Sequence, residues 1–245
     1  MKLLRASTWL HKWVALVVGI QVLFWVAGGL VMTVIPIEQV LSEHHVAESP
    51  PQPLSFSGVL GPDEVSRALG VQATSAQLKS TPRGPVWTLT PVEGEPVTVS
   101  AATGQPLPAI TEAEARSLAQ AAYVGSGRVV GAVFFQTAPQ ETGREGPMWR
   151  VEFDDAEGTS FYLSPETGEV LTRRSDVWRF YDFFWRLHIM DLENGEDFNH
   201  PLIIIATSLT LSIVISGFIL LAIRLGRDWK SWRAQSRASR GAGTT

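Results

Sequence analysis

Two long apolar runs without a charged residue frame this chain, and the section between them mixes apolar and polar positions as soluble proteins do. The runs extend from Trp13 to Ile37 and from Pro201 to Ile223. A helix needs roughly 20 apolar residues to cross about 30 Å of hydrocarbon, because it rises about 1.5 Å per residue. Both runs reach that length. The pattern therefore predicts transmembrane helices over residues 13–37 and 201–223.

A cleaved signal peptide is the alternative for the first run, since Lys2, Arg5 and Lys12 precede it. The apolar stretch is longer than the roughly 7–15 residues of a signal peptide. Residues 34–37 read Val-Ile-Pro-Ile, which contains no small-x-small cleavage site. We expect an uncleaved anchor that is preceded by a short terminal segment, residues 1–12.

The section after the first run carries signals for a linker, a short helix and two strands. Residues 38–57 form a juxtamembrane segment that ends in a proline-rich, extended linker. A helix is predicted at 61–70, because proline and acidic residues open it and glycine closes it. Alternating Trp, Thr and Val predict strands at 85–89 and 96–99.

A second unit of the same kind follows. Thr111 opens its helix with a capping box. The segment from Gly84 to Gly104 resembles the one from Gly146 to Gly168, and such self-similarity indicates one supersecondary unit used twice. We therefore expect a duplicated α+β domain, with a helix and an antiparallel sheet in residues 58–110 and again in 111–175.

An aromatic-rich helix is predicted at residues 176–192, followed by an acidic loop at 193–200. Its rings share one face at helical spacing: Trp178, Tyr181, Trp185 and His188. Aromatic rings collect at membrane surfaces. This face therefore either rests at the interface or contacts a cofactor.

The distribution of charge predicts on which side of the membrane the two termini lie. Three basic residues precede the first run, and residues 224–245 hold six basic residues against one acidic residue. The middle section is acidic. Basic flanks stay in the cytoplasm, so we expect both termini there, with 224–245 as a basic cytoplasmic tail and the central domain outside.

The absence of cysteine excludes disulfides, thiolate catalysis, iron–sulfur clusters and covalently attached haem. All five histidines lie near a predicted membrane boundary: His11, His44, His45, His188 and His200. Histidine is the usual axial ligand of a b-type haem. We expect haem b, with His11, His44, His188 and His200 as its iron ligands in more than one site, whereas His45 is left out of this set.

The expected ligands divide between the two membrane faces, about 30 Å apart. His11 lies at the inner face and the other three at the outer face, which indicates two haems. Because one chain supplies one inner histidine, we expect a homodimer or a larger membrane complex in the lipid bilayer, served by a cytoplasmic electron donor. Simpler roles stay open, since His200 precedes a proline and suits a helix N-cap, and His11 adds to the basic flank.

The sequence gives no motif for other common kinds of active site. The chain has no phosphate loop, nucleophile elbow or dinucleotide fingerprint. We assign no catalytic residue and expect no nucleic-acid partner.

Short motifs spread along nearly the whole chain share the pattern of one family. They are Trp9-Leu10-His11-Lys12-Trp13, Gly19, Gly28-Gly29, Thr103-Gly104, Thr167-Gly168, Trp185-Arg186-Leu187-His188 and Ser216-Gly217. In these features, and in its order of spans and repeats, the chain resembles the PepSY-associated transmembrane proteins.

This resemblance implies an extracytoplasmic PepSY module, periplasmic in location, on an anchor in the inner membrane of bacteria. Larger relatives with four spanning helices look like haem-containing ferric-siderophore reductases, and His11 and His188 fall on family motif positions. With two spans, this chain would need self-association to form a four-helix core. Other PepSY modules resemble inhibitory or regulatory parts of peptidase precursors.

Two functions follow as expectations. The first is a b-haem electron-transfer subunit, part of a membrane ferric reductase or another oxidoreductase, that passes electrons to ferric iron or a ferric siderophore outside the membrane. The second is a non-enzymatic PepSY module that binds or regulates an envelope protein or peptidase, or a structural subunit of a membrane complex.

Overall fold

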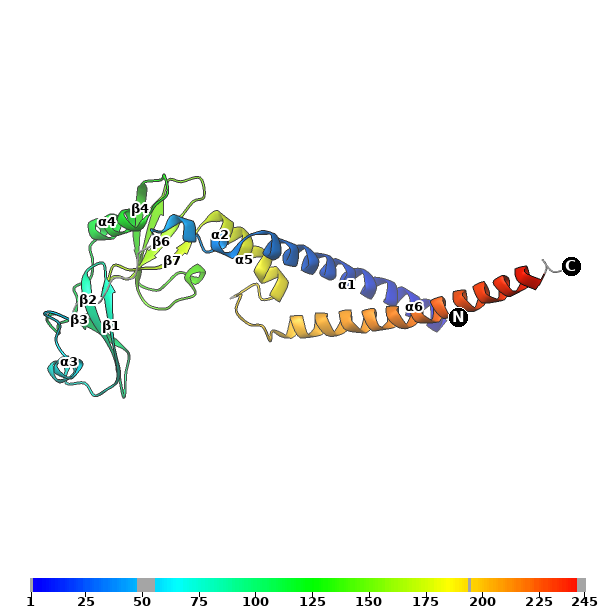
Figure 1. Ribbon diagram of the computed structural model, residues 1–245, viewed down its shortest axis with the longest axis horizontal. Helices are drawn as coiled ribbons and strands as arrows, with labels where there is room; N and C mark the ends of the chain where they lie inside the picture. The colour runs from blue at the N-terminus through cyan, green and yellow to red at the C-terminus, as the bar shows by residue number, and fades with distance from the viewer. Residues whose placement is uncertain (1, 48–55, 194, 242–245) are drawn as a thin grey trace. The chain divides into compact units, whose positions relative to one another are not determined.

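The computed structural model describes residues 2–47, 56–193 and 195–241; the side chains at 2–8, 10, 11, 216, 220 and 234–241 are outside this description. The chain divides into two compact units (Figure 1). The helical unit comprises the residues up to Val34 and those from Asp182 onward, and the sheet unit comprises Ile35–Tyr181. Most of the predicted linker, residues 48–55, lies outside the described residues.

The helical unit contains the two long helices, α1 (Lys2–Val34) and α6 (Pro201–Gly241). Within them, Lys12–Val34 and Pro201–Arg233 are long and apolar enough to cross a membrane. Their apolar side chains are largely exposed in the single chain, as lipid-facing side chains would be. Both predicted spans are therefore present as helices.

The ends of the spans differ from the prediction. Helix α1 ends at Val34 and not at residue 37, because Pro36 disfavours the helical conformation of the residue before it. Helix α6 continues beyond residue 223 to Gly241, since the Arg, Lys, Ala and Gln of the basic tail are good helix formers. Most of the predicted tail, 224–245, is thus part of a helix.

The aromatic helix α5 (Asp176–Ile189) is three residues shorter than predicted and contains the boundary between the units. Met190 ends it in the left-handed conformation, with φ of 58°. In the loop that follows, the buried Asp191 carboxylate accepts three backbone hydrogen bonds, from the N–H groups of Glu193, Glu196 and Asp197. This carboxylate organises the acidic loop from within.

The first half of the sheet unit is a helix followed by an antiparallel meander. Helix α3 (Pro62–Leu69) precedes β1 (Ala73–Thr81), β2 (Gly84–Pro91) and β3 (Val97–Ser100). The strands pair in the order β1-β2-β3. Val65, Leu89 and Val99 form the core, and the Trp87 side chain packs against it while its indole N–H donates to the Leu60 carbonyl at 2.9 Å.

The second half repeats this order with one more strand. Helix α4 (Glu112–Ala122) precedes β4 (Val129–Phe135), β5 (Met148–Phe153), β6 (Ser160–Leu163) and β7 (Val170–Arg174). The four strands pair in sequence order. Their larger core includes Tyr123, Val151, Phe153, Phe161 and Leu163.

Most local predictions in the sheet unit are confirmed, and one strand was missed. The Thr111 capping box is present, and the predicted strands correspond to β2 and β3. Strand β1 was missed because Ala73–Thr81 is largely polar and exposed, so it lacks the alternation of a half-buried strand. Both halves have the order of helix and antiparallel strands, but the duplication itself stays a prediction.

Polar contacts join the two halves of the sheet unit. The Arg83 guanidinium donates to the carbonyls of Pro108 and Glu166, both at 2.7 Å. Lys79 forms an ion pair of 2.8 Å with Glu169.

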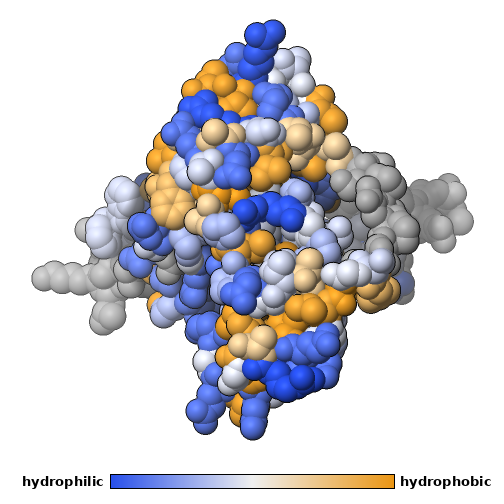
Figure 2. All heavy atoms as spheres, turned by 90° about the vertical axis from the view of Figure 1, so that its left-hand side faces the viewer, coloured by the Kyte–Doolittle hydropathy of each residue, from blue (hydrophilic) through white to orange (hydrophobic). Residues whose placement is uncertain are grey.

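The face in Figure 2 carries hydrophilic and hydrophobic residues side by side, with no single apolar patch over it.

Three short helices complete the described part of the sheet unit. They are α2 (Ile37–Val40), η1 (Glu43–His45) and η2 (Gln140–Thr142). Helix η1 lies in the sheet unit and contains His44 and His45. These two histidines therefore belong to the sheet unit and not to the end of the first span.

Candidate functional site

Three side chains of the sheet unit converge as metal ligands do. The Nε2 atoms of His44 and His45 lie 3.3 and 3.0 Å from Oε2 of Glu157. The ligand atoms of all three residues lie within 4.8 Å of one another. We call this set the His-His-Glu cluster. It combines two imidazole nitrogens and one carboxylate, which is a donor set for a divalent cation.

Segments that are far apart in the sequence position the cluster. Val124 donates its backbone N–H to the His45 carbonyl at 3.0 Å, and Asp176 donates its own to the Glu157 carbonyl at 2.8 Å. Ser42, just before the histidines, is buried in the left-handed conformation with φ of 52°, and its hydroxyl lies 3.0 Å from that of Ser175. Left-handed backbone costs a residue with a side chain about 1–2 kcal/mol, so tertiary contacts hold this turn.

Tyr123 and Asp155 contact members of the cluster and hold them in place. The Tyr123 ring stacks on His45, with centroids 5.6 Å apart, and its hydroxyl donates to Asp155 Oδ2 at 2.7 Å. Asp155 Oδ1 accepts from the backbone N–H groups of Glu157 and Thr159. The turn that carries Glu157 is therefore anchored by a second carboxylate.

The pKa values of this pair move in opposite directions. Burial, together with the hydrogen bond to Asp155, raises the pKa of Tyr123 to about 12. Burial acts to raise the pKa of Asp155 too, but hydrogen bonds from Thr159 and Tyr123 outweigh it and hold this pKa below its ordinary value. At neutral pH the pair is a neutral phenol beside a carboxylate, which adds negative charge behind the cluster.

In the helical unit, His188 makes a defined set of contacts with α1. His188 packs on Gly28 and Gly29 of α1, where a Cβ atom at Gly28 would lie 3.5 Å from the His188 Cβ. Its ring lies 5.6 Å from that of Trp25, and its Nδ1 lies 3.2 Å from the Trp25 carbonyl oxygen. Trp25 in turn donates its indole N–H to the His188 carbonyl at 2.6 Å. Gly28 and Gly29 thus allow α5 to approach α1 closely.

An apolar groove lies between α1 and α6, with a volume of about 480 Å³. Leu187 and Met190, at the end of α5, line it together with side chains of both long helices. The Gln21 amide also lines it, and its buried Nε2 has no hydrogen-bond partner among the described residues.

The remaining predicted ligands have different surroundings. His200 immediately precedes α6, and its Nδ1 accepts a hydrogen bond from the Leu202 backbone N–H at 3.4 Å. That contact is typical of an N-cap, the alternative role that its sequence position suggested. Within the described part of the helical unit, His188 and His200 share no contact. His11 lies in α1, and its side chain is outside the described residues.

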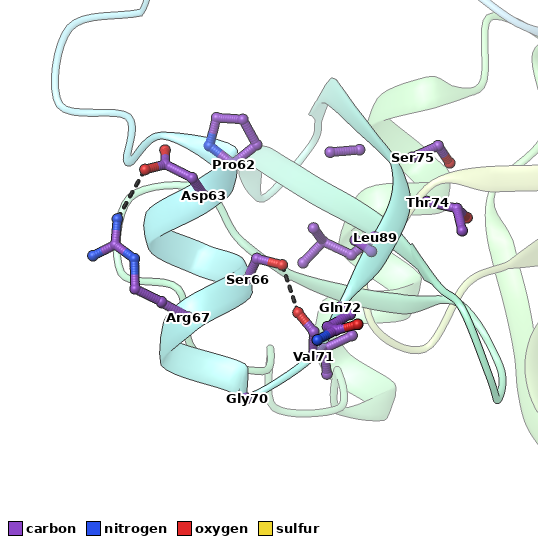
Figure 3. A pocket seen from close by; sticks show the side chains of 12 residues that line it. Pro62, Asp63, Ser66, Arg67, Gly70, Val71, Gln72, Thr74, Ser75 and Leu89 are labelled. Carbon is purple, nitrogen blue, oxygen red and sulfur yellow. Dashed lines mark hydrogen bonds and ion pairs between the residues drawn. The ribbon is translucent and has the colours of Figure 1, made fainter.

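A larger surface hollow offers less chemistry. It lies between α3 and β1, with a volume of about 710 Å³ (Figure 3). Three of its polar side chains are already paired, because Arg67 binds Asp63 at 2.8 Å and the Ser66 hydroxyl donates to the Val71 carbonyl at 2.6 Å. We therefore do not place the functional site there.

Sequence reasoning missed two members of the His-His-Glu cluster. His45 was left out of the ligand set, and Glu157 lies in an acidic turn with no metal-binding motif. The adjacent pair His44-His45 was the one available signal. Its partner could not be identified, since Glu157 follows His45 by 112 residues.

Fold and comparisons together define the class. Two helices able to span a membrane flank a unit of helices and antiparallel sheets, the architecture of a membrane-anchored α+β protein. The family model of the PepSY-associated TM region matches residues 8–242, so the chain belongs to this family of membrane proteins. Searches of curated proteins and of solved structures give no match.

Proposed function

We propose that this PepSY membrane protein is a b-haem electron-transfer subunit of the bacterial inner membrane. Both termini would lie in the cytoplasm, because the basic residues flank the two spans on that side. The sheet unit would then lie outside, where electrons reach an acceptor such as ferric iron or a ferric siderophore. A cytoplasmic donor would supply the electrons.

The setting of His188 carries this proposal. A carbonyl oxygen only accepts hydrogen bonds, so the contact with Trp25 requires the proton of the neutral imidazole on Nδ1. The lone pair then resides on Nε2, for which the described residues provide no partner. Histidine ligands of metals are commonly held in this way, with the second nitrogen donating to a carbonyl that fixes tautomer and ring orientation.

His200 has the opposite arrangement. Its Nδ1 accepts from the Leu202 N–H, which places the proton of a neutral ring on Nε2 and leaves no lone pair for a metal. Of these two predicted ligands, His188 is therefore the better suited to iron.

One histidine of each chain, His188, would hold the haem at this place. The groove lined by Leu187 and Met190, close to His188 in the sequence but not lined by His188 itself, has a volume within the roughly 300–1,000 Å³ of ligand sites. Bound haem would supply one-electron redox chemistry. His188 would hold it, Trp25 would fix the ring, and the apolar wall would exclude water. A second imidazole would come from a second copy, which is why we propose a homodimer. His11 stays the proposed ligand at the inner face.

A reduced-minus-oxidised absorption spectrum of the purified protein tests this function. We expect a b-type spectrum for the wild type and its loss in His188→Gln, because the amide can still donate to the Trp25 carbonyl but lacks an imidazole. His200→Gln is the matched control and should retain the spectrum. Haem-free wild-type protein from haem-replete cells, or unchanged haem in His188→Gln, would contradict the proposal.

The sheet unit favours a second candidate, a module that binds or regulates an envelope protein. Strand β4 is an edge of its sheet and exposes the large apolar side chains of Val130, Val133 and Phe134. An exposed apolar edge strand can pair with an extended segment of another protein. A haem-free protein would favour this candidate.

A further inference from the structure

We infer that the His-His-Glu cluster of His44, His45 and Glu157 binds a divalent first-row transition-metal ion of the zinc class. The site lies entirely within the sheet unit and is independent of the proposed haem. It includes two residues that the sequence did not single out as ligands.

The distances fit a common ion. Zinc binds imidazole nitrogen and carboxylate oxygen at about 2.0–2.2 Å, which places neighbouring ligands of a tetrahedron about 3.3–3.6 Å apart. His44 Nε2 lies 3.4 and 3.3 Å from the two oxygens of Glu157, and His45 Nε2 lies 3.0 Å from the nearer one. An ion would therefore replace the shared protons with little change in these histidine-to-glutamate distances.

The donor set determines the class of ion. Imidazole nitrogens suit zinc, iron, nickel and copper, whereas magnesium and calcium prefer sites made of oxygen alone. Two histidines and one glutamate form three protein ligands, which leaves the fourth tetrahedral position for water or another ligand. That position is accessible, because His44 and Glu157 have 43% and 36% of their side chains exposed.

The surroundings hold the ligands in place before an ion arrives. The His45 side chain is 11% exposed and stacks on Tyr123. Asp155 binds the backbone of the Glu157 turn. Its other oxygen accepts the Tyr123 hydroxyl at 2.7 Å, so the two supporting residues are themselves joined.

A metal titration of the full chain in detergent tests the site. After chelator treatment, we expect one Zn²⁺ per chain in competition with a chromophoric chelator, and no comparable binding of Mg²⁺. Glu157→Gln and His45→Ala should each weaken Zn²⁺ binding by more than about 100-fold, and Tyr123→Phe by about 10-fold, as supporting residues do. The control His200→Ala removes an imidazole outside the cluster and should bind as the wild type does.

Cobalt provides a readout of geometry. Co²⁺ in a four-coordinate site absorbs visible light strongly, so the wild type should show this spectrum and Glu157→Gln should lose it. Thermal unfolding of each variant without metal establishes that it is folded, and an unchanged haem content of Glu157→Gln separates this site from the haem proposal. Wild-type protein without Zn²⁺ binding, or Zn²⁺ binding that survives both ligand variants, would overturn the inference.

Discussion

The helical unit and the sheet unit use the same apolar residue types in opposite ways. Leu23, Val26 and Phe218 of the long helices are each more than 60% exposed, whereas Phe161 and Leu163 of the sheet unit are fully buried. Hydrophobic residues avoid water, but lipid is as apolar as their own side chains. The difference shows that one unit is built for lipid around it and the other for water.

The units also bring their histidines together with different partners. In the helical unit, Gly28 lets α5 approach α1, and His188 meets a backbone carbonyl. In the sheet unit, His44 and His45 meet the carboxylate of Glu157. A carbonyl fixes one tautomer of a neutral ligand, whereas a carboxylate adds charge that favours a cation. The two settings therefore differ in the chemistry they offer, which is why we propose a different metal centre for each.

The largest expected effect tests the contrast in burial. Phe161→Ala should lower the free energy of unfolding by about 3–5 kcal/mol, because it leaves a cavity in the closed core. Phe218→Ala should change it by less than about 1 kcal/mol, since lipid or detergent fills the space. Unfolding of both variants in detergent provides the measurement. Equal losses would contradict the lipid-facing assignment of α6.

A smaller effect tests the close approach of α5 to α1. A Cβ atom at Gly28 would lie 3.3 Å from the Phe184 carbonyl oxygen, so Gly28→Leu should destabilise the helical unit by about 1–3 kcal/mol through overpacking. At Gly217, no described atom beyond its own stretch of helix lies within 4 Å of such a Cβ. Gly217→Leu is therefore the matched control. Thermal unfolding in detergent, with Trp25 fluorescence as a local probe, compares the two.

The smallest effect concerns pH in the sheet unit. Tyr123→Phe should cost about 1 kcal/mol at neutral pH, because Asp155 loses a hydrogen-bond donor. The pKa of Tyr123 rises from 10.0 to about 12 on folding. Its protonated form therefore stabilises the fold fully below pH 10, and this contribution is lost as the pH rises toward 12. Denaturant unfolding at pH 8 to 12 should show the stability gap between wild type and variant closing; a constant gap would contradict the shift.

Local patterns determined much of this protein from the sequence alone. The two spans follow from apolar runs, the start of α4 follows from the capping box at Thr111, and strands β2 and β3 follow from alternation. These features depend on residues within one element, so the chain encodes them locally. Strand β1 escaped this reasoning, because its pairing with β2 and not its own polar sequence makes it a strand.

The tertiary structure alone decided which side chains meet. His45 and Glu157 are separated by 112 residues, and Trp25 and His188 by 163. No local periodicity connects such positions, because their distance depends on how whole elements pack. The sequence therefore identified the histidines as the residues of interest, and only the fold assigned a carboxylate to one pair and a backbone carbonyl to another.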